Sequence, residues 1–166
     1  MLDVIYFSRS GNTKKVATAI SEELGVKARH IRSVESLPQN ADIFLGSGLY
    51  FMRPSKLVRD FIRNNDFRGR RVAIFGTSTT GIGIETLGME WLLKRKGAVI
   101  IGKYYCPGRF FLRIAGKFIC LRQERPDILD LACASEFARS IRNGIGVGQK
   151  AETRGERHEE RILSGV

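Results

Sequence analysis

A chain of 166 residues and 18.6 kDa has the length of one domain. Its hydrophobic residues (43%) and charged residues (27%) lie near the globular average, which excludes a wholly disordered or collagen-like chain. The 28 Lys and Arg residues outnumber the 17 Asp and Glu residues, and the resulting net charge of +11 directs attention to anionic ligands and partners.

The sequence shows no sign of export or of membrane insertion. Residues 1–7 have no basic segment and only a short apolar run, and no stretch approaches the roughly 18 apolar residues of a membrane span. Cys106, Cys120 and Cys133 form no Cys-x-x-Cys pair, which disfavours a disulfide framework or a structural zinc site. We therefore expect a cytoplasmic protein with reduced thiols and no bound metal.

The first half of the chain predicts alternating strands and helices. Residues 4–7 form an apolar run of strand length, and a helix follows with Val16, Ile20 and Leu24 on its apolar face. Residues 26–31 alternate apolar and basic types, which predicts a half-exposed strand at a sheet edge. The third strand, 43–45, is continuously apolar, as expected where helices cover both faces of a sheet.

The second half continues this alternation, with further buried strands predicted at 72–75 and 99–101. Three more helices are predicted, with apolar faces formed by Leu57, Val58, Phe61 and Ile62, then by Ile84, Leu87, Trp91 and Leu92, and then by Leu131, Ala134, Ala138 and Ile141. Ser55 and Asp127 stand where they can begin the second and the last helix. We expect one α/β domain over 1–143 and a flexible or partly helical tail over 144–166.

The loop after the first strand has the composition of a phosphate-binding turn. Small hydroxylated residues and one glycine let the backbone wrap an anion with its N–H groups, while the positive end of the following helix dipole points at it. The loop consists of Ser8, Arg9, Ser10, Gly11, Asn12 and Thr13. It matches neither the Gly-x-Gly-x-x-Gly nor the Gly-x-x-x-x-Gly-Lys pattern of the usual nucleotide cradles, and an ordinary capped turn is the alternative.

Two other strands also end in glycines and small polar residues. Residues 46–51, Gly-Ser-Gly-Leu-Tyr-Phe, follow the third strand, and residues 76–81, Gly-Thr-Ser-Thr-Thr-Gly, follow the fourth. In an open parallel sheet such loops meet beyond the carboxyl ends of the strands, where ligands bind. Tyr50 and Phe51 can stack on a flat ring or pack in the core. The three loops together suit a phosphorylated aromatic cofactor.

These three segments, in this order and spacing, resemble the flavodoxin family over residues 1–143. The resemblance implies a flavodoxin-like three-layer α/β/α sandwich with a five-stranded parallel sheet in the order 2-1-3-4-5. It also implies non-covalently bound FMN and electron transfer by the flavin ring. By position, residues 8–13 would hold the phosphate, Ser47, Gly48, Leu49, Tyr50 and Phe51 one ring face, and Thr77, Ser78, Thr79, Thr80 and Gly81 the ring edge. No catalytic residue is implied.

The sequence departs from the flavodoxin pattern in two respects. Residues 77–83 contain no aromatic residue, although flavodoxins usually carry one there, so the second ring face is either open or covered by Tyr104, Tyr105 or a partner. Flavodoxins that carry electrons are also mostly acidic, whereas this chain is basic. Residues 94–125 contain nine bases and one acid, while residues 144–166 contain four of each. The excess charge therefore lies within 1–143.

Residues 109–122 interleave basic residues with apolar ones. As a helix this segment would be amphipathic and could lie on an anionic membrane surface or receive an acidic, ferredoxin-like redox protein; the alternative is a connector packed on the last strand. A similar stretch occurs in quinone-dependent protoporphyrinogen oxidases of flavodoxin type. A membrane-associated enzyme of that class, peripheral at the membrane, is thus the alternative to an electron carrier. A nucleic-acid-binding domain is less favoured, since no recognition motif is present. The oligomeric state stays open.

Overall fold

In the computed structural model, five parallel strands form one sheet in the order β2-β1-β3-β5-β6. The structure describes residues 1–50, 53–79, 87–114, 117–121 and 124–144. The parallel strands are β1 (Leu2–Phe7), β2 (Ala28–His30), β3 (Asp42–Tyr50), β5 (Arg71–Ser78) and β6 (Val99–Pro107), and a short strand, β4 (Arg53–Pro54), pairs antiparallel with β3. Counting only the parallel strands, this is the predicted order 2-1-3-4-5.

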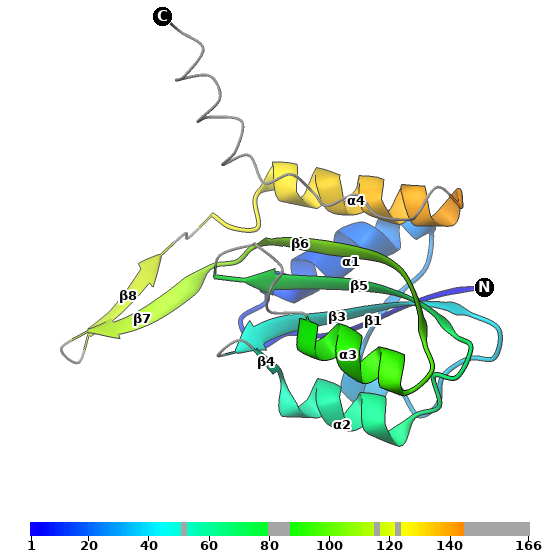
Figure 1. Cartoon of the computed structure of the whole chain (residues 1–166). Helices are drawn as coiled ribbons and strands as arrows, with labels where there is room; N and C mark the ends of the chain where they lie inside the picture. Colours follow the sequence, from blue (N-terminus) through cyan, green and yellow to red (C-terminus); the bar gives the residue numbers. More distant parts are fainter. Residues whose placement is uncertain (51–52, 80–86, 115–116, 122–123, 145–166) are drawn as a thin grey trace, which may run out of the picture.

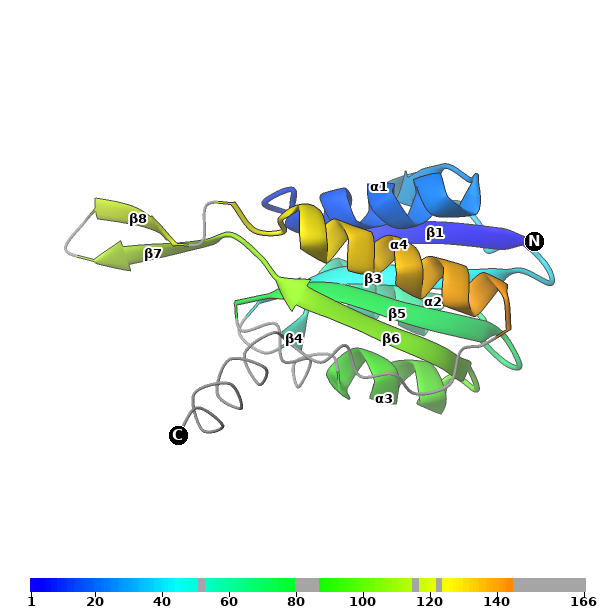
Figure 2. The same cartoon turned by 90° about the horizontal axis from the view of Figure 1, so that it is seen from above.

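Helices cover both faces of this sheet, as Figures 1 and 2 show. Helices α1 (Asn12–Leu24) and α4 (Ile128–Arg142) cover one face, and α2 (Lys56–Asn64) and α3 (Leu87–Arg95) cover the other. A short 3-10 helix, η1 (Ile31–Ser33), follows β2. Val4 and Phe44 pack toward α1 and α4, while their neighbours Ile5 and Ile43 pack on the opposite side. The strands therefore bury residues on both faces, which confirms the three-layer sandwich.

Two predicted helix starts are confirmed by the capping bonds. The Ser55 hydroxyl accepts a hydrogen bond from the Val58 amide at 3.2 Å. Asp127 and Asp130 form a reciprocal capping box, in which each carboxylate accepts a hydrogen bond from the other residue's amide. These bonds satisfy N–H groups that have no partner within the helix.

The apolar face predicted for the third helix is wrong for two of its three described residues; the third, Leu92, packs partly buried against the core. Leu87 and Trp91 are 58% and 55% exposed, whereas Met89 and Leu93 are fully buried. The Arg95 guanidinium lies 4.6 Å from the Trp91 ring centroid, so the ring is partly covered on the surface. The exposed pair and the buried pair are each four residues apart, so both fit one face of a helix. The packing of α3 on the sheet buries the face with Met89 and Leu93. Ile84 lies outside the described residues.

Strands β3 and β5 are longer than the sequence predicts, because the glycine-containing segments 46–48 and 76–78 continue the ladder. Gly46 lies where a Cβ atom would stand 2.1 Å from Cε2 of Phe75, so the two strands can approach only without a side chain there. Val99 is 53% exposed rather than buried, because β6 is an edge strand. The other edge is β2, as predicted.

The segment after β6 is a β-hairpin rather than the amphipathic helix considered above. Strands β7 (Phe110–Ile114) and β8 (Lys117–Leu121) pair antiparallel and form a separate two-stranded sheet. The hairpin projects away from the sheet and the helices in both views (Figures 1 and 2). Aromatic and β-branched residues favour strands, which explains why the helical interpretation failed.

The tail predicted over 144–166 lies, beyond Gly144, outside the described residues. Within the described part of the chain, none of the helices has the length and apolar character needed to cross a membrane.

Candidate functional site

The loop between β1 and α1 leaves the helix start available to a ligand. Gly11 is the residue preceding the helix and has φ 85°, a left-handed conformation that glycine adopts without strain. Among the residues that the structure describes, no side chain caps the helix, and its first turn contains no acidic residue. The amides at the start of α1 and the positive end of the helix dipole therefore favour an anion at this position.

The Ser8 hydroxyl in the same loop is buried and has no hydrogen-bond partner among the described residues. Most buried polar groups in folded proteins are paired, so an orphaned hydroxyl beside a helix N-terminus is suited to donate to a ligand. A phosphate oxygen is a strong acceptor for such a hydroxyl. The residues present therefore fit a phosphate group.

The start of α1 contacts the end of β5, which lies two strands from β1 in the sheet. The hydroxyls of Thr13 and Thr77 lie 2.9 Å apart in a buried hydrogen bond that links the start of α1 to the end of β5. Ser78 is also buried, and Thr79 is exposed just beyond the strand. Ser47 of β3 pairs with Phe7 on one side and with Gly76 on the other, so the starts of all three predicted loops lie together at this edge of the sheet.

The third predicted loop begins inside the sheet. Ser47 is fully buried in β3, and its hydroxyl donates to the Gly48 carbonyl at 2.7 Å. Leu49 and Tyr50 are the last residues of β3. Phe51, Thr80 and Gly81 lie outside the described residues. Contact of these residues with a cofactor stays a prediction.

Gly108 and the Arg109 backbone also belong to this site, although the sequence does not predict them there. The Asn12 side-chain amide donates to the Arg109 carbonyl at 2.9 Å, and a Cβ atom on Gly108 would stand 2.7 Å from Nδ2 of Asn12. The Arg109 guanidinium donates to the Ser10 carbonyl at 3.3 Å. These contacts join residues about a hundred positions apart, and no local pattern marks them.

Tyr104 is not available to cover the second face of a flavin ring. It is only 3% exposed, and its ring stacks on Phe137 of α4 with centroids 5.8 Å apart. Its hydroxyl donates to the Asp130 carbonyl. Tyr105, its neighbour on β6, packs partly buried against the cluster on the opposite face of the sheet.

Next to Tyr104, burial raises the pKa of the Cys106 thiol from 9.0 to about 12, and the nearby Asp130 carboxylate adds to the shift. The folded protein keeps this thiol neutral, while the unfolded chain ionises it above about pH 9. The contribution of the Cys106 thiol to the unfolding free energy is therefore fully present below about pH 9 and is lost as the pH rises toward about 12.

We expect Cys106 to account for a loss of about 1.4 kcal/mol in unfolding free energy between about pH 8 and about pH 10. Urea denaturation at both pH values measures it, and a Cys106→Ala variant should lack this part of the decrease. Cys133 is exposed and provides the control: the Cys133→Ala variant should show the same decrease in unfolding free energy as the wild type. Equal pH dependence in all three proteins would contradict the prediction.

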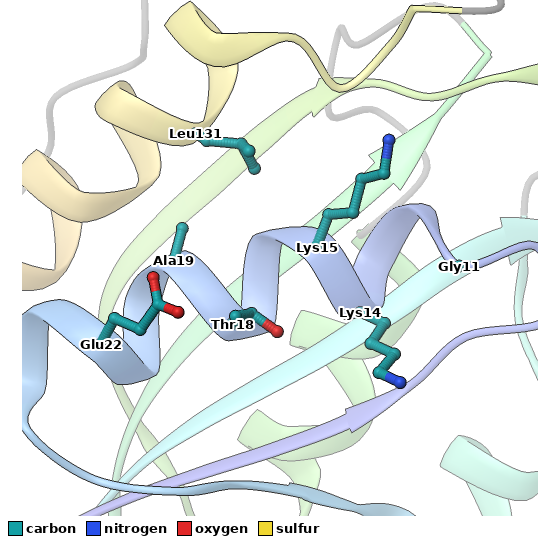
Figure 3. A pocket seen from close by; sticks show the side chains of 7 residues that line it. All are labelled: Gly11, Lys14, Lys15, Thr18, Ala19, Glu22 and Leu131. Atoms are coloured by element: carbon teal, nitrogen blue, oxygen red, sulfur yellow. The ribbon is translucent and has the colours of Figure 1, made fainter.

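A hollow of about 260 Å³ lies between α1 and α4. Figure 3 shows Lys14 and Lys15 pointing in different directions at its rim, with Leu131 on the α4 side. It is lined by Gly11, Lys14, Lys15, Thr18, Ala19, Glu22 and Leu131 and meets the predicted phosphate loop only at Gly11. The hollow is a groove along α1 that adjoins the candidate site at Gly11.

Comparison with known sequences decides the family. The sequence profile described as "Flavodoxin domain" matches residues 3–97, which include the loop after β1 and the ends of β3 and β5. The chain belongs to the flavodoxin family. An uncharacterized protein of Methanocaldococcus jannaschii is 31% identical to this flavodoxin-family chain over 134 residues, 78% of the chain and 89% of the relative.

Solved structures agree with this family in fold. A flavodoxin from the domain Archaea has a TM-score of 0.66 at 18% identity and covers 87% of this chain and 97% of its own. A Fusobacterium nucleatum flavodoxin bound to flavin mononucleotide has a TM-score of 0.63 at 15% identity, and the match covers 86% of this chain and 97% of that flavodoxin. Flavodoxin 2 from Bacillus cereus has a TM-score of 0.61 at 22% identity, and the match covers 86% of this chain and 98% of that flavodoxin.

Proposed function

We propose that this flavodoxin-family chain binds FMN at the carboxyl edge of its sheet and transfers electrons. The observation that carries the proposal is the buried Ser8 hydroxyl beside the start of α1, for which the described part of the chain offers no hydrogen-bond partner. A flavodoxin of the same fold is bound to flavin mononucleotide, which supports the same ligand here.

The phosphate would be held mainly by the backbone. The amides at the start of α1 donate to it, and the hydroxyls of Ser8, Ser10 and Thr13 add side-chain donors. The ring would lie between the segments 47–51 and 77–81. Bound FMN supplies one- or two-electron transfer through its ring, while the protein orients it and sets the local electrostatics.

Removing the orphaned hydroxyl tests the phosphate site. We expect Ser8→Ala to leave the unfolding free energy of the apoprotein unchanged or raise it by about 1 kcal/mol, because an unsatisfied polar group is removed. The same change should weaken FMN binding roughly tenfold, because a hydrogen bond to a charged group is lost. Fluorescence titration and urea denaturation measure the two effects.

Ser21 provides a matched control for that variant. It is also a buried serine, but its hydroxyl donates to the Thr18 carbonyl at 2.9 Å in the later part of α1. Ser21→Ala should bind FMN like the wild type. If Ser8→Ala also retains full affinity, Ser8 is not a phosphate ligand.

Redox titration tests the electron-transfer function. The net charge of +11 favours added negative charge at the site, although salt screens charges beyond roughly 10 Å. We therefore expect the FMN-loaded protein to be reduced reversibly, at a higher potential than an acidic flavodoxin titrated alongside. An equal or lower potential would contradict the electrostatic argument. Quinone-dependent oxidation of protoporphyrinogen by the same preparation would assign the oxidase activity instead.

A further inference from the structure

The register of the β7–β8 hairpin separates its residues onto two faces. Residues opposite each other in an antiparallel pair share a face, and so do alternate residues along a strand. One face, which we term the apolar face, therefore has the positions Phe110, Leu112, Ile114, Ile119 and Leu121, with Lys117 next to the turn. The other face has Phe111, Arg113, Phe118 and Cys120. Apolar residue types thus occur on both faces of an outlying hairpin.

An isolated two-stranded hairpin is only marginally stable in water, and it usually needs something to pack against. β7 and β8 form a sheet of their own, and both views show the hairpin extending beyond the sheet and the helices (Figures 1 and 2). A concentration of apolar residues in such a place indicates an interaction surface.

The charge of the segment limits what that surface can bind. Residues 109–122 contain four basic residues and no acidic residue. A second copy of the chain would bring another four bases against these, which disfavours pairing of two hairpins. An anionic partner is complementary to the segment.

The base of the hairpin is fixed to the candidate site by backbone hydrogen bonds. The Gly108 amide donates to the Ser78 carbonyl at 2.8 Å, and the Arg109 amide donates to the Arg125 carbonyl at 3.1 Å. The Asn12 side chain holds the Arg109 carbonyl, as described above. The hairpin therefore leaves the domain beside the start of α1 and the end of β5, so its base lies next to the candidate cofactor site.

We propose that the β7–β8 hairpin docks this protein on an anionic lipid membrane surface. The apolar residues enter the interfacial region, where lipid can cover both faces of the hairpin, and the basic residues meet the anionic headgroups. A protein partner that packs on one face would leave apolar positions of the other face in water. Docking in this way turns the carboxyl edge of the sheet toward the membrane (Figures 1 and 2). Exchange of electrons with a partner located there rests on the proposed function.

Co-sedimentation with vesicles tests the proposal on the whole chain supplied with FMN. The vesicles contain either phosphatidylcholine alone or equal parts of phosphatidylcholine and phosphatidylglycerol. We expect binding to the anionic vesicles only, and weaker binding in high salt. Arg113→Gln with Lys117→Gln should weaken binding about thirty-fold, given the attraction of each basic residue to an anionic surface. The cross-strand pair Leu112→Ser with Ile119→Ser should weaken it roughly tenfold or more.

The matched control removes two basic residues near the amino ends of the strands, away from the hairpin. Arg63→Gln with Lys94→Gln changes exposed residues near the ends of α2 and α3 and should bind vesicles like the wild type. Far-ultraviolet circular dichroism and FMN retention establish that each variant is folded, and hydrogen exchange should show the hairpin amides protected only on anionic vesicles. Absence of binding, or equal loss in the control, overturns the proposal. Concentration-dependent dimerisation abolished by the hairpin variants, without vesicle binding, would assign the surface to a second copy.

Discussion

Gly46→Ala is expected to destabilise the fold by roughly 3 kcal/mol or more, because the added methyl group overlaps a ring that cannot move away. The new Cβ atom would stand 2.1 Å from Cε2 and 2.2 Å from Cζ of Phe75. Phe75 is fully buried between the sheet and the α1–α4 layer, so its ring can yield only by displacing other core residues. Urea denaturation of the apoprotein measures the change in unfolding free energy.

Gly88 in α3 provides the control for this effect. A Cβ atom there would lie 3.5 Å from Cδ of Pro54, which is an ordinary van der Waals contact. Gly88 is the second residue of α3, outside the helix interior where alanine has its full advantage over glycine, so Gly88→Ala should change the unfolding free energy by no more than about 0.5 kcal/mol. A Gly46→Ala variant within about 1 kcal/mol of the wild type would contradict the close approach of β3 and β5.

Ser10→Asp is expected to weaken FMN binding at least about a hundred-fold, because it places a carboxylate in the loop that would hold the phosphate. Ser10 is half-buried and directly precedes the left-handed Gly11 at the start of α1. A carboxylate at this position also competes with the phosphate for the helix amides. Titration of the apoprotein with FMN measures the affinity.

Thr18→Asp introduces the same charge on the exposed side of the same helix, beyond its first turn. The effect of a helix terminus falls off within that first turn, so this variant should bind FMN with little change. Thermal unfolding of both apoproteins shows whether they are folded. Comparable loss of affinity in the two variants would mean that net charge, rather than the loop after β1, controls binding.

The sequence was sufficient to predict features that depend on local pattern. Val16 and Ile20 recur at helical spacing and are fully buried on α1. Asp127 precedes the last helix and caps it. The edge position of β2 follows from its alternation of apolar and basic residues. The strand order itself came from the resemblance to flavodoxins.

Features that depend on contacts between distant residues could not be predicted in this way. The two faces of α3 have similar apolar content, and only its packing on the sheet selects Met89 over Trp91. The extension of β3 through Gly46 depends on its approach to Phe75 across the sheet. The Asn12 contact with the Arg109 carbonyl likewise exists only once the hairpin base is folded against the loop.

The central claim is that the loop after β1 binds the phosphate of FMN, and the most direct measurement compares FMN with riboflavin, which lacks the phosphate. Apoprotein is added to each flavin while the flavin fluorescence and visible absorption are recorded. We expect one FMN per chain to be quenched at micromolar concentration and riboflavin to bind at least about a hundred-fold more weakly, because it forms none of the charged contacts with the loop. Absence of FMN binding, or equal affinity for the two flavins, would contradict the claim.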